Sequence, residues 1–592
     1  MTEQLLIAAL LIAPLAGWLL AEAVPNRRNS ALFISAAITG MVALSWLGCS
    51  YAGMTRSAAQ ISVGRWLIIP DGNGLAVNLS FYADQSRCML TLAASLILLL
   101  RIARSRHAAN DVESSGPLLY PLSIAAIMVT DLVVMASLWI VIDCCVVGLF
   151  ARRAGSATPS RRGLNTATIL SGSGALLLLA SLMAMARYHS SVISEIVAGA
   201  AENHRIDATT VASGFSVLIV AAAAIRCALF PALIWPRSGL ESDSRDAGIV
   251  VVLAGILPGI SVAAALTSPG TVASEAFLLF GMLGVLTCFT ATGVALAQND
   301  VVKVATLLSI SAAGLSAAGI ATSSPTLGRI AMCTLFVQLV AIFVLRRCSD
   351  VSNRGTAFGV AILVAVSGIG GANRILTLIE ISLVEARKID SENSTSQLLI
   401  YMWWGIVISQ ILWGVAVVKL ATIQPSKDAS RTDRTIDSRL GTFVVTIAAC
   451  LALIACMIPL SGVQSAVPVL LLTFGAATPA CLLGAVAGWL LARSSEAARV
   501  RVAGSLDSLT RLGREWFYID NSIHYGIRLP VRVSALLAEL CDRKVFGSRS
   551  EDGWKHMLTR IADSFEYLRT QPATYYGLTG TLLVVGLLWA LA

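Results

Sequence analysis

The sequence predicts an all-α polytopic membrane protein of about sixteen transmembrane helices. Of its 592 residues, 56% are hydrophobic and only 13% are charged, whereas soluble domains carry about 25% charged residues. Apolar stretches of the length that crosses a bilayer, about 20 residues, recur along the whole chain. The net charge of +9 does not indicate nucleic-acid binding, because the basic residues lie in short segments between spans, where they set orientation.

The predicted spans cover residues 5–22, 31–49, 88–104, 117–132, 133–150, 166–187, 210–235, 247–267, 275–297, 302–321, 327–346, 356–376, 399–420, 441–461, 467–492 and 574–592. Every second connecting segment is rich in arginine, beginning with Arg27 and Arg28. Because basic segments face the cytoplasm, both termini are expected on the external side. The split between the fourth and fifth spans depends on Asp131, which we interpret as a solvated end residue.

Two segments between spans have patterns of their own. Residues 66–84 place the turn sequence Asp71–Gly74 between β-prone runs, which predicts an external β-hairpin. Residues 550–570 carry apolar residues at spacings of 4, 3, 4 and 3, starting from Trp554. This pattern predicts a lateral amphipathic helix on the cytoplasmic membrane face, with a small cytoplasmic helical bundle as the alternative.

The seventh span contains a charge and a helix breaker. Arg226 lies within the span and Pro231 follows five residues later. A charge at the centre of a span costs about 2.5–3.5 kcal/mol on insertion scales, so it indicates a functional site. The twelfth span carries Gly368, Gly370 and Gly371, and two interrupted spans five apart indicate two inverted repeats with a path at the midplane.

Several motifs resemble those of the large antiporter-like subunit of respiratory complex I (subunit L of NADH–quinone oxidoreductase), a relative of the large subunits of Mrp-type cation/proton antiporters. The matching residues are, in chain order, Asp131–Leu132 with Trp139, Ile225–Pro231 with Trp235 and Leu240–Glu241, Asp300 and Lys303 with Ile310–Ser311 and Gly314, Gly368 with Ile375–Leu376, and Asp520 with Pro530. Their order and spacing cover nearly the whole chain. The resemblance divides it into N-terminal spans with the hairpin (1–116), a first repeat (117–267), a second repeat (275–420) and C-terminal spans with the lateral helix (441–592).

This resemblance implies a membrane-arm subunit of a respiratory chain complex in an energy-coupling inner (cytoplasmic) membrane, where proton translocation is coupled to electron transport. The implied partners are other membrane-arm subunits and the lipid bilayer. Flavin, iron–sulfur clusters and quinone are expected on partner subunits and not in this chain. We expect no catalytic, cofactor-binding or metal site here, since the 12 cysteines show neither a CxxC pair nor a metal-ligand spacing.

The family's ladder of ionisable residues is mostly missing. Its positions on spans five, eight and twelve are Ile140, Val251 and Ala372, and its lysine on span seven is Arg226. In 331–343 the only ionisable group is the thiol of Cys333. Apolar side chains cannot exchange protons, and arginine, unlike a buried lysine, stays protonated.

One compensation is expected. Asp143 follows Ile140 by three residues, which would place both on one helix face, and Asp143 would then pair with Arg226. A structural ion pair and a transport role are both open for this pair. Glu241, Asp300 and Lys303 are weaker candidates. For Glu241 and Asp300 at span ends the alternative is a solvated face, and for Lys303, one turn into its span, the alternative is a side chain that snorkels to the interface.

Three functions remain open from the sequence. The first is a complex I-type membrane-arm subunit with a degenerate relay. The second is an Mrp-like cation/proton antiporter subunit or another ion-driven transporter subunit. The third is a non-pumping structural paralogue that occupies the antiporter-like position.

Overall fold

The computed structural model describes residues 2–24, 27–51, 58–68, 76–104, 116–153, 161–188, 190–193, 195–196, 209–241, 247–265, 274–321, 325–350, 372–373, 375–377, 379–380, 382–383, 394–422 and 476–493. Several predicted features lie outside these residues: the turn Asp71–Gly74, the glycines Gly368, Gly370 and Gly371, the motif residues Asp520 and Pro530, the amphipathic helix at 550–570, and the spans at 441–461 and 574–592.

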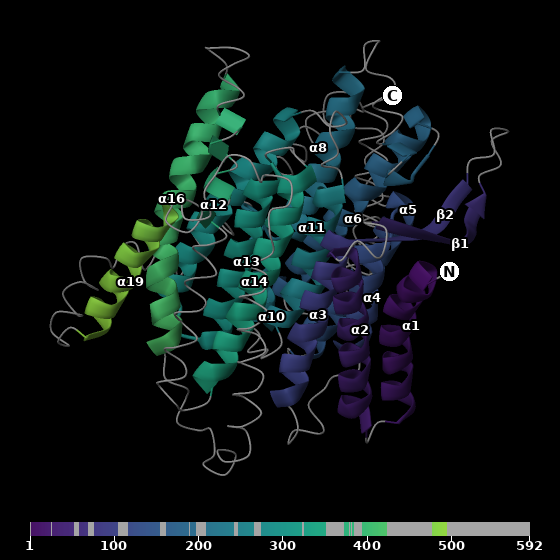
Figure 1. Ribbon diagram of the computed structural model, residues 1–592, viewed down its shortest axis with the longest axis horizontal. Coiled ribbons are helices and arrows are strands. Elements are labelled where there is room, and N and C mark those ends of the chain that lie inside the picture. Colours follow the sequence, from purple (N-terminus) through teal and green to yellow (C-terminus); the bar gives the residue numbers. More distant parts are fainter. Residues whose placement is uncertain are drawn as a thin grey trace, which may run out of the picture.

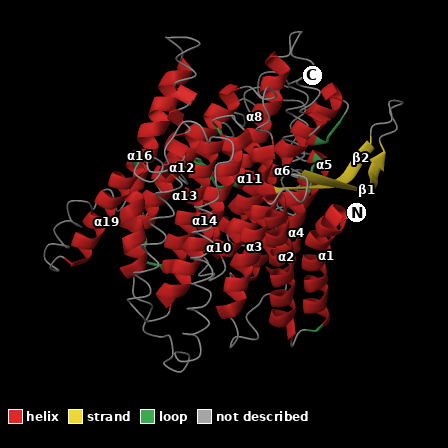
Figure 2. Ribbon diagram, in the orientation of Figure 1, coloured by secondary structure: helices red, strands yellow, loops and turns green. Residues whose placement is uncertain are grey.

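The described part is mostly helical (Figure 2). Its N-terminal elements are α1 (Thr2–Ala23), α2 (Arg28–Tyr51), β1 (Ala58–Ile68), β2 (Ala76–Asp84), α3 (Gln85–Arg104), α4 (Gly116–Met128), α5 (Leu132–Arg153) and α6 (Arg161–Tyr188). They are followed by α8 (Thr209–Arg226), α9 (Ile234–Glu241), α10 (Ala247–Val250), the π-helix η2 (Val251–Ile256), α11 (Leu257–Ala265), α12 (Ser274–Ala297), α13 (Val301–Ile320), α14 (Pro325–Asp350), α16 (Ser394–Thr422) and α19 (Ala477–Arg493).

Within the described residues, eight helical segments are long and apolar enough to cross a membrane, and five shorter apolar helices accompany them. Such segments satisfy all backbone hydrogen bonds internally, as a bilayer requires. The protein is therefore a multi-pass membrane protein. The count of sixteen spans, the inverted repeats and the domain boundaries stay predictions.

The helices form one bundle in which elements far apart in the sequence lie side by side (Figure 1). α1 and α2 form one end, α16 and α19 form the opposite end, and α12, α13 and α14 lie between the middle and the α16 end. Several contacts join helices that are not consecutive in the chain: α3 packs against α14, and α8 packs against α11 and α12. The main buried core includes residues from α1 through to α16 and α19, among them Trp46, Trp139 and Trp235.

The strands β1 and β2 pair antiparallel, with Ala58 opposite Asp84 and Ile68 opposite Ala76. β1 begins at Ala58, eight residues before the start of the predicted hairpin at residue 66. The predicted turn Asp71–Gly74 lies outside the described residues. The pair is anchored on the helices: the backbone N–H of Thr130 donates to Ser80 O at 3.1 Å, and their hydroxyls are 2.6 Å apart.

The junction of α4 and α5 corrects one expectation. The helices are separate, as the position of Asp131 predicted, but this residue is fully buried and not solvated. Its carboxylate accepts from the N–H of Val133 at 2.9 Å and from Ser191 Oγ at 2.6 Å. The carboxylate thus caps the α5 N-terminus, while the buried guanidinium of Arg87 donates to Met128 O at 2.9 Å and caps the end of α4. Charges at this junction are buried because helix termini need partners where water is scarce.

Candidate functional site: a buried ion pair beside a broken helix

Helix α8 ends at Arg226, five residues before Pro231, where the sequence predicted the helix break. Ala228 has a left-handed backbone with φ of 58°. The N–H of Leu229 donates to Ala224 O at 2.9 Å and that of Ala228 to Ile225 O at 3.1 Å. These bonds form a Schellman motif, which satisfies carbonyls at a helix end. Arg226 is therefore the last residue of a helix that stops inside the protein, not a residue in a continuous span.

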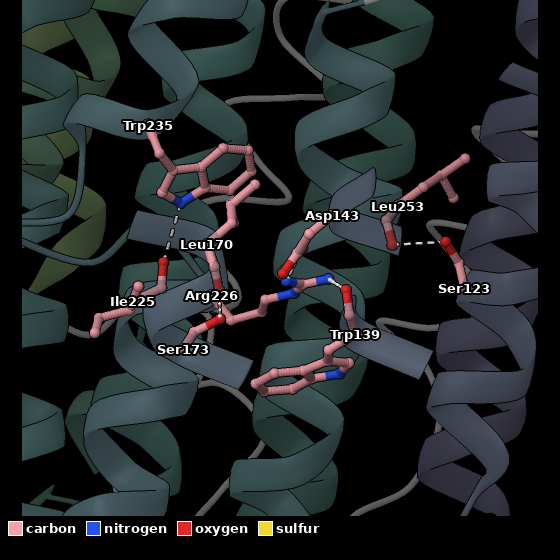
Figure 3. Close-up of polar contacts among 9 residues, drawn as sticks. All are labelled: Ser123, Trp139, Asp143, Leu170, Ser173, Ile225, Arg226, Trp235 and Leu253. Atoms are coloured by element: carbon pink, nitrogen blue, oxygen red, sulfur yellow. Dashed lines mark hydrogen bonds and ion pairs between the residues drawn. The ribbon is translucent and has the colours of Figure 1, made fainter. Parts of the chain in front are cut away.

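The break continues through Pro231, which has no N–H to donate and therefore interrupts the hydrogen bonding of a helix. The chain resumes as α9 at Ile234, and the indole of Trp235 reaches back to donate to Ile225 O at 3.0 Å (Figure 3). From the other side, Thr287 on α12 accepts from the N–H of Phe230 at 2.7 Å. Backbone groups freed by the break are thus bound by neighbouring side chains, as a membrane interior demands.

The end of α8 presents the guanidinium of Arg226 to α5. Its Nη1 pairs with Asp143 Oδ1, and its Nη2 lies 3.5 Å from Trp139 O. The guanidinium also lies over the Trp139 ring, 4.8 Å from the ring centroid (Figure 3). Arg226 is fully buried and Asp143 nearly so. The structure therefore brings together the two residues that the sequence placed 83 positions apart.

This cluster is incompletely paired. Within the described residues, Asp143 Oδ2, Arg226 Nε and Trp139 Nε1 are buried and have no hydrogen-bond partner. A buried ion pair is stable only if good geometry and further hydrogen bonds offset the loss of hydration. The cation–π contact supplies about 0.5–2 kcal/mol of that offset. One open acceptor, Asp143 Oδ2, and two open donors, Arg226 Nε and Trp139 Nε1, indicate a site that can make further hydrogen bonds.

The helix behind the pair is distorted. Residues Val251–Ile256 form a fully buried π-helix, a distortion that often occurs at functional sites. Because the N–H of Leu257 donates to Val252 O, Leu253 O has no α-helical donor, and Ser123 of α4 donates to it at 2.7 Å (Figure 3). A side-chain contact from α4 therefore stabilises the π register.

Two glycines let this helix approach the broken end of α8. A Cβ on Gly255 would lie 2.6 Å from Arg226 O, and one on Gly259 would lie 2.5 Å from Cys227 Sγ. Such short distances between helices are possible only where a residue has no side chain. This is the usual reason for small residues between membrane helices. Gly255 and Gly259 thus pack directly against the C-terminal end of α8, where Arg226 lies.

One argument for the pair was wrong although its conclusion was right. The side chain of Ile140 is 47% exposed, whereas Asp143 is buried, so the two lie on different faces of α5. Asp143 shares its face with Trp139, four residues earlier. The carboxylate therefore extends an inward face that begins with an indole, and Ile140 points away from the pair.

The other candidates lie apart from the pair. Asp300 is exposed and caps α13, accepting from the N–H of Val302 at 2.6 Å and of Lys303 at 3.4 Å. Lys303 is half-buried in the first turn of α13. In the described part of the chain, no hydrogen bond or ion pair joins either residue to Arg226 or Asp143. Glu241 is the last residue of α9.

Two of the positions without ionisable groups, Val251 and Ala372, are buried, whereas Ile140 is exposed. Val251 begins the π-helix, and Ala372 is fully buried. Cys333 on α14 donates to Met89 Sδ on α3 at 3.1 Å. These side chains pack and exchange no protons.

Sequence reasoning missed three contributors to the site: Trp139 as a platform, Ser123 as the donor to the π-helix, and the glycine pair. The sequence contained a signal for two of these three contributors. Trp139 precedes Asp143 by four residues, the spacing of one helix face, and Gly255 and Gly259 have the G-x-x-x-G spacing typical of close helix contacts. Nothing in the sequence marks Ser123.

Comparison with known proteins gives matches at the level of fold. No family model and no curated protein matches the chain. Among solved structures, a chain of the Mrp complex from Dietzia sp. DQ12-45-1b aligns with a TM-score of 0.62 and 16% identity, over 96% of this chain and 63% of that one. This chain thus spans less than two thirds of that relative.

Two further matches cover nearly the whole of the other chain. A chain of respiratory complex I from Thermus thermophilus aligns with a TM-score of 0.55 and 15% identity, over 87% of this chain and 99% of that one. A chain of the membrane-bound sulfane sulfur reductase, an archaeal respiratory membrane complex, aligns with a TM-score of 0.63 and 14% identity, over 94% and 99%. The fold is that of a membrane-complex subunit. At these identities the likeness shows the fold alone, and it agrees with the family that the motifs resemble.

Proposed function

We propose that this chain is the large antiporter-like, membrane-arm subunit of a complex I-type NADH–quinone oxidoreductase, and that its proton relay is degenerate. The observation that carries the proposal is the buried Arg226–Asp143 pair at the broken end of α8. A desolvated ion pair at a helix break in a membrane interior is costly to maintain. Its presence within this fold favours a role in ion translocation or in its control over simple packing.

The pair can act as a fixed charge that responds to its surroundings. Arginine does not release its proton, so Asp143 is the member of the pair that can exchange one. Asp143 Oδ2 is free of a partner among the described residues and is thus open to water or to a neighbouring proton carrier. Since Ile140, Val251 and Ala372 are apolar, a proton at Asp143 has no side-chain relay through those positions, and we propose local charge coupling in place of full pumping.

Redox chemistry then belongs to partner subunits, which would hold flavin, iron–sulfur clusters and quinone. In this assembly the chain would lie in an energy-coupling inner membrane with both termini on the external side. Correspondence with 99% of the length of a complex I chain supports a subunit of that size and fold.

An Mrp-like cation/proton antiporter subunit is the second candidate, favoured by the alignment of 96% of this chain with a chain of an Mrp complex. The two differ in their partners. A complex I-type subunit would co-purify with redox subunits, whereas an Mrp-like subunit would co-purify with small membrane subunits.

The test is purification of the tagged chain from its native membranes in mild detergent, with identification of co-purifying subunits and an NADH–quinone assay. Recovery with flavin- and iron–sulfur-bearing subunits and quinone-dependent NADH oxidation is the expected result. Arg226→Ala in proteoliposomes would then reduce proton translocation per NADH oxidised, while Arg28→Ala, which breaks only the partly exposed pair with Glu22, would leave it unchanged. Recovery alone, or with small antiporter subunits and no redox activity, would overturn the proposal.

A further inference from the structure

The interface between α13 and α14 contains buried polar side chains that the proposed function does not use. α13 contributes Thr306, Ser309 and Ser316, and α14 contributes Thr334 and Gln338. All five are at most 3% exposed. We call this set the α13–α14 polar seam.

Contacts at both ends establish how the two helices align. At one end Ser316 Oγ donates to Ala331 O at 3.1 Å. At the other end Thr306 Oγ1 and Arg346 Nη1 lie 2.6 Å and 3.3 Å from the point that a Cβ on Gly248 would occupy. Residue numbers fall along α13 as they rise along α14, so the helices are antiparallel.

This alignment places the middle of the seam. With the same rise of about 1.5 Å per residue on both helices, Gln338 lies level with Ser309. Thr334 and Gln338 follow Ala331 by three and seven positions, which puts all three on one helix face. Because the Cβ of Ala331 lies 3.0 Å from the point that a Cβ on Gly319 of α13 would occupy, that face is the one directed at α13.

Two atoms in this seam lack partners. Within the described residues, Thr334 Oγ1 and Gln338 Oε1 are buried and have no hydrogen bond. Ser309 donates its hydroxyl to Ala305 O at 2.9 Å, which leaves the lone pairs of its oxygen open. Buried polar groups in folded proteins are nearly always paired, with protein or with ordered water.

We propose that the α13–α14 polar seam is a binding site for ordered water. Thr334 and Gln338 are one turn apart, with Cβ atoms about 5–6 Å from each other, a separation that one water molecule bridges. That water accepts from the Thr334 hydroxyl and donates to Gln338 Oε1 and to the Ser309 oxygen. Three hydrogen bonds are typical of a buried water.

The site is electrically neutral, which sets it apart from a proton relay. Between residues 331 and 343 the only ionisable group is the thiol of Cys333, and it is directed at Met89 on α3. Arg346 places a positive charge at one end of the seam, where it repels cations. This part of α14 thus holds water without a group that exchanges protons with it.

The first experiment is a cryo-EM map of the full chain in its native assembly, at a resolution that shows ordered waters elsewhere. Density within hydrogen-bond distance of both Thr334 Oγ1 and Gln338 Oε1 is expected, and Thr334→Val or Gln338→Leu would remove it. Thr290→Val is the matched control, because Thr290 is buried but donates to Leu286 O within its own helix at 2.8 Å. Absence of density beside these atoms in the wild type, or its persistence in both variants, would overturn the proposal.

Thermal unfolding gives a second readout that does not need a map. If Gln338 Oε1 binds water, Gln338→Leu removes a hydrogen-bonded bridge and lowers the unfolding midpoint. If the oxygen is truly unpaired, the apolar replacement removes an unsatisfied buried group, and the midpoint stays the same or rises. An unchanged or raised midpoint would therefore contradict the water site.

Discussion

The replacement Asp143→Asn tests the energetic role of the central ion pair most directly. It keeps the shape of the side chain and removes its charge, which leaves the guanidinium of Arg226 buried with the Trp139 ring and the long contact to Trp139 O. Breaking a buried pair in this way costs about 3–5 kcal/mol. Arg226→Met is expected to cost a similar amount, because it leaves a buried carboxylate.

The double variant Arg226→Met with Asp143→Leu should be much less harmful than the two single changes together. Replacing both partners by apolar side chains removes the charges and their desolvation cost, and such replacements are often neutral. The sum of the single changes would be about 6–10 kcal/mol. We expect the double variant to cost less than either single change.

Chemical denaturation in mixed micelles measures these free energies of unfolding, with labelling of the buried Cys227 thiol as a local reporter. The matched control is Glu22→Gln. It breaks the partly exposed pair between Arg28 and Glu22, joined at 2.8 Å, and surface pairs contribute about 0–1 kcal/mol. If Asp143→Asn costs no more than Glu22→Gln, or if the double variant equals the sum of the singles, the reasoning about the buried pair fails.

Three further changes probe the surroundings of the pair. Gly255→Ala would push a Cβ against the broken end of α8 and should lower the free energy of unfolding by about 1–3 kcal/mol, whereas Gly172→Ala, with nothing within 4 Å of the added atom, should be harmless; equal effects would contradict the close contact. Ser123→Ala leaves Leu253 O without its donor and should cost about 1–3 kcal/mol, with faster amide hydrogen exchange at 251–257 as the readout; unchanged exchange would show that the π-helix does not need this bond. Ala228→Gly should stabilise by about 1 kcal/mol, because glycine adopts the left-handed conformation without a Cβ clash, and a lower thermal midpoint would argue against the Schellman ending.

Some features of the fold were visible in the sequence because they depend on local pattern. Composition alone places the chain in a membrane, and Asp131 correctly marked the boundary of two helices in a long apolar run. The burial of Asp131 was not visible in the sequence. Its carboxylate accepts hydrogen bonds from the N-terminus of its own helix and from Ser191 in a distant segment. The two strands were likewise indicated by the β-prone runs on either side of the turn Asp71–Gly74. The start of β1 could not be predicted, because it depends on pairing with β2.

In the candidate site, too, local pattern predicted some features and packing decided the others. Helix periodicity is a property of one segment, so Arg226 and Asp143 could be proposed as partners, yet the argument through Ile140 assigned the wrong face. Only packing decided which side of α5 turns inward. The ending of α8 before Pro231 and the π-helix at Val251–Ile256 also depend on contacts from other helices, namely Trp235, Thr287 and Ser123.

The sequence by itself determined the class of protein, the approximate position of most described spans and the identity of the two charges in the Arg226–Asp143 pair. The tertiary structure alone decided that these charges meet, that an indole lies beneath the guanidinium, and that glycines hold the break from behind. The physical reason is range. Hydropathy and helix period act over a few neighbouring residues, whereas the partners of a buried charge or an open carbonyl come from segments more than eighty residues away.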